Sequence, residues 1–237
     1  MASFVRMAAF AAFALFASPP APAAGATAGG LVDELARAAP NADRKVLQLA
    51  ANAVTCVRAR DPANTPRTLS VIDYSKPSTQ RRLWVFDLSA ATLLFEEWVA
   101  HGRNSGGNLA ERFSNDAGSL MSSVGVFVTE GTYTGHNGYS LRLRGLDAGF
   151  NDHAFERAIV MHGADYVSEG VIKGQGRLGR SLGCPAVRRE VAMPLIDTIR
   201  DGSLVFAYFP LAEWLRSSSY VGGCTTGGAA TGAAAAP

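Results

Sequence analysis

The sequence is poor in residues that bind metal ions, and it carries no excess of positive charge. Among its 237 residues there are four histidines and three cysteines, and 22 basic side chains are nearly balanced by 20 acidic ones. A clustered basic face is typical of nucleic-acid-binding domains, so this balance gives no indication of a nucleic-acid partner. Zinc sites usually show closely spaced Cys and His ligands, and His101, His136 and His153 form no such pattern with a neighbour. A metal site is therefore the weaker alternative for these histidines.

No apolar run is long enough to be a stable membrane anchor, which needs about 20 apolar residues. The stretch from Met7 to Ala17 is apolar but short, and it follows Arg6, the only charged residue among the first 32. Small residues at positions 21–26 complete a pattern that is typical of a secretory signal peptide. We therefore predict a cleaved signal peptide at residues 1–24. The mature protein is expected to be exported, periplasmic or associated with the cell wall, and without a stable membrane anchor.

The number of cysteines is odd. An exported chain meets an oxidising compartment, where disulfides form, and three cysteines leave at least one thiol without a partner in the chain. The simplest arrangement pairs Cys56 with Cys224 and leaves Cys184 free. The alternative is that Cys56 is a small apolar core residue, since it lies on the same helical face as Val46 and Ala53. Connectivity does not follow from sequence, so both interpretations stay open.

The patterning of the chain changes from helical to strand-like after residue 67. Residues 41–59 place apolar side chains at the spacing of an amphipathic helix, with Asn41 as the expected N-cap. Prolines break the segment 61–67. The expected strands are 68–74, 82–88, 92–101, 125–129, 139–146, 157–163 and 203–209, and shorter helices are expected at 31–38 and around 188–200.

These patterns predict a mainly β domain with a helical N-terminal extension, α+β overall. We place the extension and its linker at residues 30–67 and the domain at 68–215. Residues 216–237 form a low-complexity tail, whose last part is composed almost entirely of Gly, Ala and Thr, as is typical of disordered segments.

One histidine and one cysteine flank a glycine-rich segment in the second half of the chain. His162 ends a predicted strand and precedes Gly163, and Cys184 lies in a glycine-flanked turn just before a predicted helix. A thiol with a pKa of about 8.5 is mostly protonated at pH 7. A neighbouring imidazole and a helix N-terminus lower this pKa and favour the nucleophilic thiolate. The N–H groups of Leu182, Gly183 and Cys184 would then form an oxyanion hole.

The same two residues have a plainer interpretation. A lone cysteine is often a small buried hydrophobe, and a histidine at a strand end is often only a hydrogen-bonded structural residue. The two interpretations differ in one contact, because a base and its nucleophile lie within hydrogen-bond reach, about 3–4 Å in a resting enzyme. On the residues alone, both interpretations stay open.

The order of the motifs resembles the L,D-transpeptidases, and in particular the murein L,D-transpeptidase catalytic domain proteins. The pair HG at 162–163, a glycine-rich spacer and SLGC at 181–184 follow the family pattern of HG, a spacer and S/T-x-G-C. The stretches DYSKPSTQRRLWVFDL, HGRNSGG, FSN and RLGRSLGCPAV also match, so the resemblance covers about residues 68–210. Two positions depart from the pattern: Leu182 stands where many members have His, and Ala186 stands where many have Arg or Asn.

The resemblance implies a β-sandwich catalytic domain that needs neither a metal nor an organic cofactor. Cys184 would be the nucleophile, His162 the general base, and the carbonyl of Gly163 would orient the imidazole. On this basis we predict that His162 and Cys184 face each other, about 3–4 Å apart. The implied partners are peptidoglycan stem peptides, and members of the family are typically acylated by carbapenems. Further residues implied to shape the site or to bind substrate are Ser181, Arg180, Arg177, Tyr139 and His101, with Leu182 and Gly183 as oxyanion residues. For Tyr139 and His101 a structural role is the alternative.

Three functions are compatible with these residues. The first is transpeptidation, in which a thioester on Cys184 is passed to an amine and gives a 3→3 cross-link. The second is hydrolysis of the same thioester, as in an L,D-carboxypeptidase. The third is a non-catalytic module that binds cell-wall peptides, with Cys184 buried and inert. A papain-like site is disfavoured, because that family places its Cys well before its His.

Overall fold

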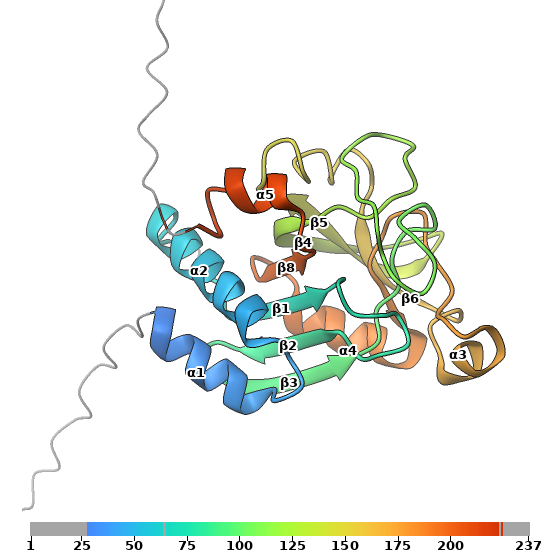
Figure 1. Cartoon of the computed structure of the whole chain (residues 1–237), viewed down its shortest axis with the longest axis horizontal. Helices are drawn as coiled ribbons and strands as arrows, with labels where there is room; N and C mark the ends of the chain where they lie inside the picture. Colours follow the sequence, from blue (N-terminus) through green and yellow to red (C-terminus); the bar gives the residue numbers. More distant parts are fainter. Residues whose placement is uncertain (1–27, 64, 223, 225–237) are drawn as a thin grey trace, which may run out of the picture.

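The computed structural model of the protein describes residues 28–63, 65–222 and 224, so the predicted signal peptide and nearly all of the tail beyond residue 222 lie outside it. Within these residues, eight strands form one continuous sheet in the order β3-β2-β1-β8-β4-β5-β6-β7 (Figure 1). The predicted fold class, mainly β with N-terminal helices and α+β overall, is confirmed. The strands are β1 (Thr68–Asp73), β2 (Leu83–Asp87), β3 (Thr92–Glu97), β4 (Gly125–Gly135), β5 (Gly138–Gly145), β6 (Val160–Ala164), β7 (Ala186–Arg188) and β8 (Leu204–Tyr208). The helices are α1 (Ala28–Ala38), α2 (Arg44–Arg60), α3 (Glu169–Gln175), α4 (Arg189–Ile199) and α5 (Ala212–Ser217).

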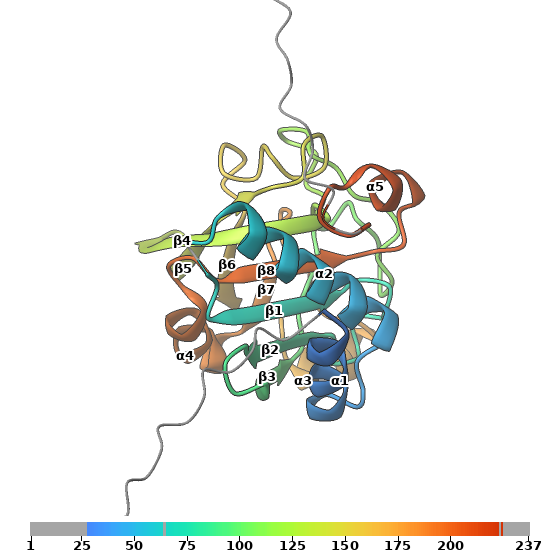
Figure 2. The same ribbon diagram turned by 90° about the vertical axis from the view of Figure 1, so that its left-hand side faces the viewer.

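The central strands are buried on both faces, because helices cover both faces of the sheet. Every residue of β1 and β8 is buried. Leu69 and Phe206 belong to a core that includes residues of α1, α2 and α5, whereas Ile72 and Val205 belong to a second core that includes residues of α4. Figure 2 shows α2 lying across β1 and β8. This layering explains why β8 reads as an unbroken apolar run rather than an alternating one.

The alternation predicted for β2 is confirmed. Leu83 and Val85 lie in the core that includes α4, and Trp84 and Phe86 lie in the core that includes α1 and α2. The predicted helix at 41–59 is α2, but its N-cap is Asp43 rather than Asn41. The carboxylate of Asp43 accepts hydrogen bonds from two N–H groups of the first turn, which is the usual role of an N-cap.

A disulfide ties α2 to the C-terminal end of the described chain. Cys56 and Cys224 are bridged, with their Cα atoms 5.0 Å apart and 168 positions between them in the sequence. Cys184 is a free, buried thiol. The bridge closes residues 56–224 into one loop, and cross-links over long loops restrict the unfolded chain most strongly.

Three short elements were not predicted. The helix α3 lies in the glycine-rich segment, where Ser168 caps its start and Gly176, in the left-handed conformation with φ +67°, ends it. The strand β7 has only three residues, which is too short to show a period. The helix α5 covers the core through the buried Trp214. Among the described residues, no helix is long and apolar enough to cross a membrane.

We expect the Cys56–Cys224 bridge to contribute about 2–5 kcal/mol to stability, as native disulfides of small exported domains do. Replacing Cys56 by Ser should therefore lower the thermal midpoint in non-reducing buffer, and reductant should lower the wild-type midpoint to about the same value. Cys184→Ser is the matched control, because that thiol is free. Equal midpoints for wild type and Cys56→Ser would contradict the prediction.

Candidate active site

His162 lies in the middle of β6 and is almost completely buried. The residue is 4% exposed, and its Nδ1 lies 3.0 Å from the carbonyl oxygen of Gly163, the contact that the resemblance assigns to that glycine. Because a carbonyl only accepts hydrogen bonds, we assign the hydrogen to Nδ1 and the lone pair to Nε2. Burial lowers the pKa of His162, the Gly163 carbonyl opposes this, and the charge of Arg189 lowers the pKa further. The imidazole is therefore neutral at pH 7 and can accept a proton at Nε2.

Cys184 is a buried thiol at the end of the turn that leads into β7. Its Sγ accepts a hydrogen bond from the N–H of Val160 at 3.5 Å and lies 3.7 Å from the carbonyl oxygen of Ala158. Burial raises the pKa of Cys184, opposed by the Val160 N–H and by the charge of Arg157. The thiol is therefore protonated at pH 7 in this state of the protein.

The expected helix N-terminus beside Cys184 is not there. The strand β7 occupies residues 186–188, and α4 begins only at Arg189. The effect of a helix dipole is confined to the first turn, so α4 is not positioned to lower the pKa of the Cys184 thiol. The expectation that a helix N-terminus lowers the pKa of this thiol was therefore wrong.

The pairing of β6 with β7 sets the relation between the two candidate catalytic residues. The strands are parallel, and His162 is paired with Ala186. Cys184 precedes Ala186 by two residues, and its Sγ contacts Val160, which precedes His162 by two residues. Cys184 itself lies in a bend outside the strand, so the register brings the turn that carries it beside the start of β6.

The predicted hydrogen bond between His162 and Cys184 is not present among the described residues. The Sγ is directed toward the start of β6, where it contacts Val160 and Ala158, whereas the imidazole bonds to Gly163 near the end of the strand. The contact between the two side chains therefore stays a prediction.

The turn before Cys184 is closed by its own serine. The hydroxyl of Ser181 accepts the N–H of Gly183 at 3.0 Å and donates to the carbonyl of Cys184 at 2.6 Å. The Gly183 N–H is thus occupied and is not available for the predicted oxyanion hole in this state. The N–H groups of Leu182 and Cys184 donate to no other residue in the part of the chain that the structure describes. The candidate oxyanion donors are therefore reduced to these two.

Both glycines of the candidate site are required by close packing. A Cβ on Gly163 would lie 2.8 Å from the Cβ of Ala192 in α4. Gly183 has a φ of +130°, and a Cβ there would lie 2.8 Å from the carbonyl oxygen of Met121. The sequence argument assigned the space at Gly183 to a substrate carbonyl. The structure shows that the backbone of Met121 borders it.

A serine-rich segment, residues 114–123, holds the turn from the other side. The hydroxyl of Ser122 donates to the carbonyl of Gly183 at 2.9 Å and accepts the N–H of Gly102 at 3.0 Å. The N–H of Ser122 in turn donates to Ser105 at 2.9 Å. Three separate segments of the chain thus meet at the residue before Cys184 and fix its backbone.

Arg157 anchors this segment and is a residue that sequence analysis missed. It lies just before β6, in the stretch RAIVMHG that we expected to be entirely strand. Its guanidinium also supplies the positive charge that lowers the pKa of the Cys184 thiol. The only sequence signal for Arg157 is its position just before a buried strand. Its four acceptors are the carbonyls of Ser114 and Met121 and the hydroxyls of Ser119 and Ser123, at 2.6–3.0 Å.

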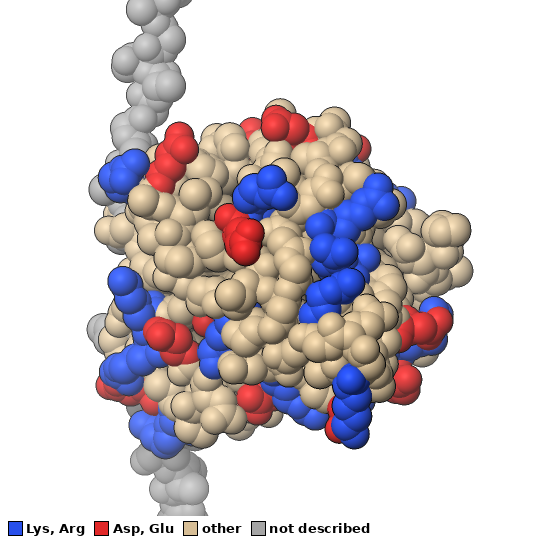
Figure 3. Space-filling model, turned by 45° about the vertical axis from the view of Figure 1, so that its right-hand side comes forward, with Lys and Arg blue, Asp and Glu red and all other residues tan. Residues whose placement is uncertain are grey.

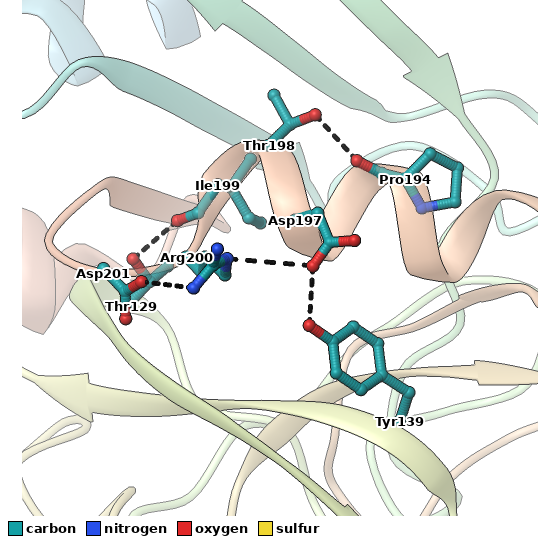
Figure 4. A network of polar contacts seen from close by, with 8 residues as sticks. All are labelled: Thr129, Tyr139, Pro194, Asp197, Thr198, Ile199, Arg200 and Asp201. Carbon is teal, nitrogen blue, oxygen red and sulfur yellow. Dashed lines mark hydrogen bonds and ion pairs between the residues drawn. The ribbon is translucent and has the colours of Figure 1, made fainter.

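Two residues implied to bind substrate have structural contacts instead. His101 is fully buried, and its Nδ1 lies 2.8 Å from the guanidinium of the equally buried Arg82. Burial, together with Arg82, lowers the pKa of His101 to about 4, so it is a neutral, fully buried residue. The hydroxyl of Tyr139 donates to Asp197 of α4 at 2.6 Å (Figure 4). Because the next residue, Ser140, pairs with His162, Tyr139 lies on the opposite face of the sheet.

The remaining predicted residues surround the turn. Arg180 donates to the carbonyls of Arg103 and Gly106 at 3.2 and 2.9 Å, and thereby holds the loop that follows His101. Arg177 donates to the carbonyl of Leu178 at 2.8 Å. Leu182 is 61% exposed. Whether any of them contacts substrate stays a prediction.

Positive charge gathers on one face of the molecule. Figure 3 shows a band of Lys and Arg side chains running down this face, with few acidic residues beside it. Arg103 and Arg112 are exposed in the loop next to the turn, and Arg180 reaches that loop through its hydrogen bonds. Among the described residues there is no cluster of His, Cys, Asp and Glu that could hold a metal ion.

We expect Arg157→Gln to raise the pKa of the Cys184 thiol, because the substitution removes the positive charge that favours the thiolate. The pH dependence of the iodoacetamide reaction with Cys184 should shift to higher pH, measured by intact mass at a series of pH values.

Arg157→Lys, which keeps the charge, should stay near the wild type. Arg144→Gln is the matched control, because Arg144 pairs with the exposed Glu130 on the β4–β5 hairpin. An unchanged profile in a folded Arg157→Gln protein would show that Arg157 does not act on the thiol.

Comparisons with known proteins agree with the motif order. Residues 38–208, more than half of the chain, match the L,D-transpeptidase catalytic domain family. The comparison with curated proteins gave no match. Similar solved structures include an L,D-transpeptidase from Mycobacterium smegmatis, with 12% identity over 60% of this chain and 59% of that one and a TM-score of 0.39.

Two further structures are similar at the same low identity. L,D-transpeptidase 3 from Mycobacterium tuberculosis, in complex with a faropenem-derived adduct, shares 13% identity over 61% of each chain, with a TM-score of 0.37. An L,D-transpeptidase from Stackebrandtia nassauensis shares 14% identity over 75% of this chain and 76% of that one, with a TM-score of 0.35. The match spans about 60% of the length of the Mycobacterium smegmatis protein. On the family match, the resemblance of the motifs is confirmed, and this chain belongs to the L,D-transpeptidase catalytic domain family.

Proposed function

We propose that this protein is a cysteine acyltransferase that acts on peptidoglycan stem peptides and forms 3→3 cross-links. One observation carries the proposal: the free Cys184 thiol contacts Val160 at the start of β6, the strand on which the neutral His162 follows two residues later. The same two residues stand in the HG and S-x-G-C motifs that carry the resemblance to the family.

The first step of the proposed reaction is proton transfer from the Cys184 thiol to Nε2 of His162. It requires rotation of the Cys184 side chain away from Ala158, because no hydrogen bond joins the two groups in the resting state. Resting enzymes often have loose catalytic contacts that tighten with substrate. The Gly163 carbonyl stabilises the imidazolium that forms, since Nδ1 already donates to it.

The second step is acyl transfer. The thiolate attacks the carbonyl at the L-centre of the diamino acid in a tetrapeptide stem, and the terminal D-Ala leaves with a proton from His162. The N–H groups of Leu182 and Cys184 are the proposed donors to the oxyanion. The basic surface around Arg103 and Arg112 suits the carboxylates of the substrate. An amine of a second stem then takes the acyl group from Cys184.

We further propose that the reaction takes place outside the cytoplasm, in the periplasm or at the cell wall. The support is the signal-peptide pattern at the start of the sequence and the Cys56–Cys224 disulfide, since disulfides persist in oxidising compartments.

One observation favours the binding-module alternative. Cys184 is only 8% exposed, and burial raises the pKa of its thiol, as in an inert structural cysteine. Hydrolysis of the thioester differs from transfer only in the acceptor. Product analysis with and without an added amine separates hydrolysis from transfer, and thiol reactivity separates both from binding.

We expect the mature protein to gain one drug mass on incubation with a carbapenem, observed by intact-mass spectrometry. The adduct should be absent from Cys184→Ala, while the disulfide-bonded Cys56 and Cys224 should remain unmodified. An unmodified wild type would favour the binding module.

We expect His162→Gln to slow this acylation about 10²–10⁴-fold, the usual contribution of a general base. In the wild type the rate should fall only at pH values below 6.5, because the pKa of His162 lies below the ordinary imidazole value of 6.5 and the protonated ring cannot accept a proton. Stopped-flow acylation rates between pH 4 and 8 measure both the slower reaction of His162→Gln and the pH dependence of the wild type. A His162→Gln protein that is acylated at the wild-type rate would remove His162 from the mechanism.

A further inference from the structure

A cavity of about 210 Å³ opens beside His162 at the end of β6. Three elements build it: the end of β6 with the residues that follow it, the turn between β4 and β5, and the start of α4. Cys184 lies toward the other end of β6, where its Sγ contacts Val160. His162 thus stands between the thiol and the cavity.

Opposite charges stand side by side in the cavity wall. The guanidinium of Arg189 donates to both carboxylate oxygens of Asp165, one of these bonds being 2.8 Å long. The side chains are 59% and 79% exposed. An exposed ion pair of this kind stabilises a fold very little. Arg189 has five N–H donors, of which Asp165 occupies those on two nitrogens, so donors remain for a further carboxylate.

Tyr166 is a further polar residue of the cavity wall. It lines the cavity, and its ring is held by Gly179, where a Cβ would lie only 2.3 Å from the Cβ of Tyr166. Burial, with a smaller contribution from Cys184, raises the pKa of Tyr166 to about 12, so the phenol stays protonated and able to donate. Its hydroxyl has no hydrogen-bond partner among the described residues.

We propose that this cavity binds the acceptor of the transfer reaction as an amino-acid head group, with ammonium and carboxylate on the same carbon. The carboxylate binds Arg189 and the ammonium binds Asp165, so the two charges of the ligand match the two charges of the wall. Asn137 and Tyr166 add polar groups around it. The inference rests on the proposed acyl transfer and assigns the side from which the acceptor arrives.

The chemistry of this step balances without a further reagent. The ammonium first loses one proton to water, and the neutral amine attacks the thioester carbon on Cys184. A C–N bond forms while Nε2 of His162 takes the second proton from nitrogen. The C–S bond then breaks, and the imidazolium returns that proton to the thiolate.

The test compares two acceptors that differ only in the carboxylate. A tetrapeptide stem is the donor, glycine and glycinamide are the acceptors, and mass spectrometry gives the ratio of transfer product to hydrolysis product. We expect the wild type to prefer glycine about tenfold or more, the effect of one charge-assisted contact. The amine of glycinamide is less protonated at neutral pH, so simple solution reactivity would give the opposite order.

Substitutions at the ion pair should remove this preference. Arg189→Gln should bring the glycine-to-glycinamide ratio close to one, and Asp165→Asn should lower transfer to both amines. Arg200→Gln is the matched control at the C-cap of the same helix, where Arg200 pairs with Asp197 and Asp201 (Figure 4). It should keep the wild-type ratio.

The outcomes separate this inference from the proposed function. Carbapenem acylation of Cys184 is measured for every variant, and transfer is expressed per acylatable enzyme. Absence of the adduct from wild type overturns acyl transfer itself. Acylation with only hydrolysis, with equal use of the two amines, or with an unchanged preference in Arg189→Gln overturns the acceptor site and leaves acylation standing.

Discussion

The parallel pairing of β6 with β7 is the contact on which the candidate site depends. Ala186 is paired with His162 on one side, and on the other its backbone exchanges hydrogen bonds with Ala100 at 2.8 and 3.5 Å. A strand of three residues would not form alone, so β7 exists because it is held between two segments. The turn that carries Cys184 is thereby fixed against β6. Without that register a cysteine and a histidine 22 positions apart in the sequence would have no defined relation.

The same packing that orders the turn also makes the Cys184 thiol less reactive. Ser122 fixes the backbone at Gly183, and the carbonyl of Met121 fills the space beside it. This closure removes water from Cys184 and raises the pKa of its thiol, since desolvation disfavours the charged form. The Val160 N–H and Arg157 act in the opposite direction. A buried thiol of this kind needs a nearby base to react, because too little thiolate exists at pH 7.

Features set by local periodicity were predictable, and features set by distant contacts were not. The amphipathic pattern located α2, and strict alternation assigned both faces of β2 correctly. The motif order around His162 and Cys184 identified the family. Arg157 was missed because its acceptor Ser114 is 43 positions away, and the occupied turn was missed because Ser122 meets Gly183 across 61 positions. The interposed β7 was missed because three residues show no period. The helix expected around 188–200 is α4, but its N-terminus was wrongly expected to lie beside the thiol.

In the proposed mechanism His162 stays in place and Cys184 moves. The imidazole is held through Nδ1 by Gly163, and Gly163 cannot shift because α4 packs where its Cβ would be. The thiol is held only by two sulfur contacts, and sulfur is a weak donor and a weak acceptor. A cysteine side chain has three staggered rotamers about one bond, so leaving Ala158 for the imidazole costs little. A fixed base between a rotating thiol at the start of β6 and a charged cavity at its end can serve both halves of an acyl transfer without itself changing position.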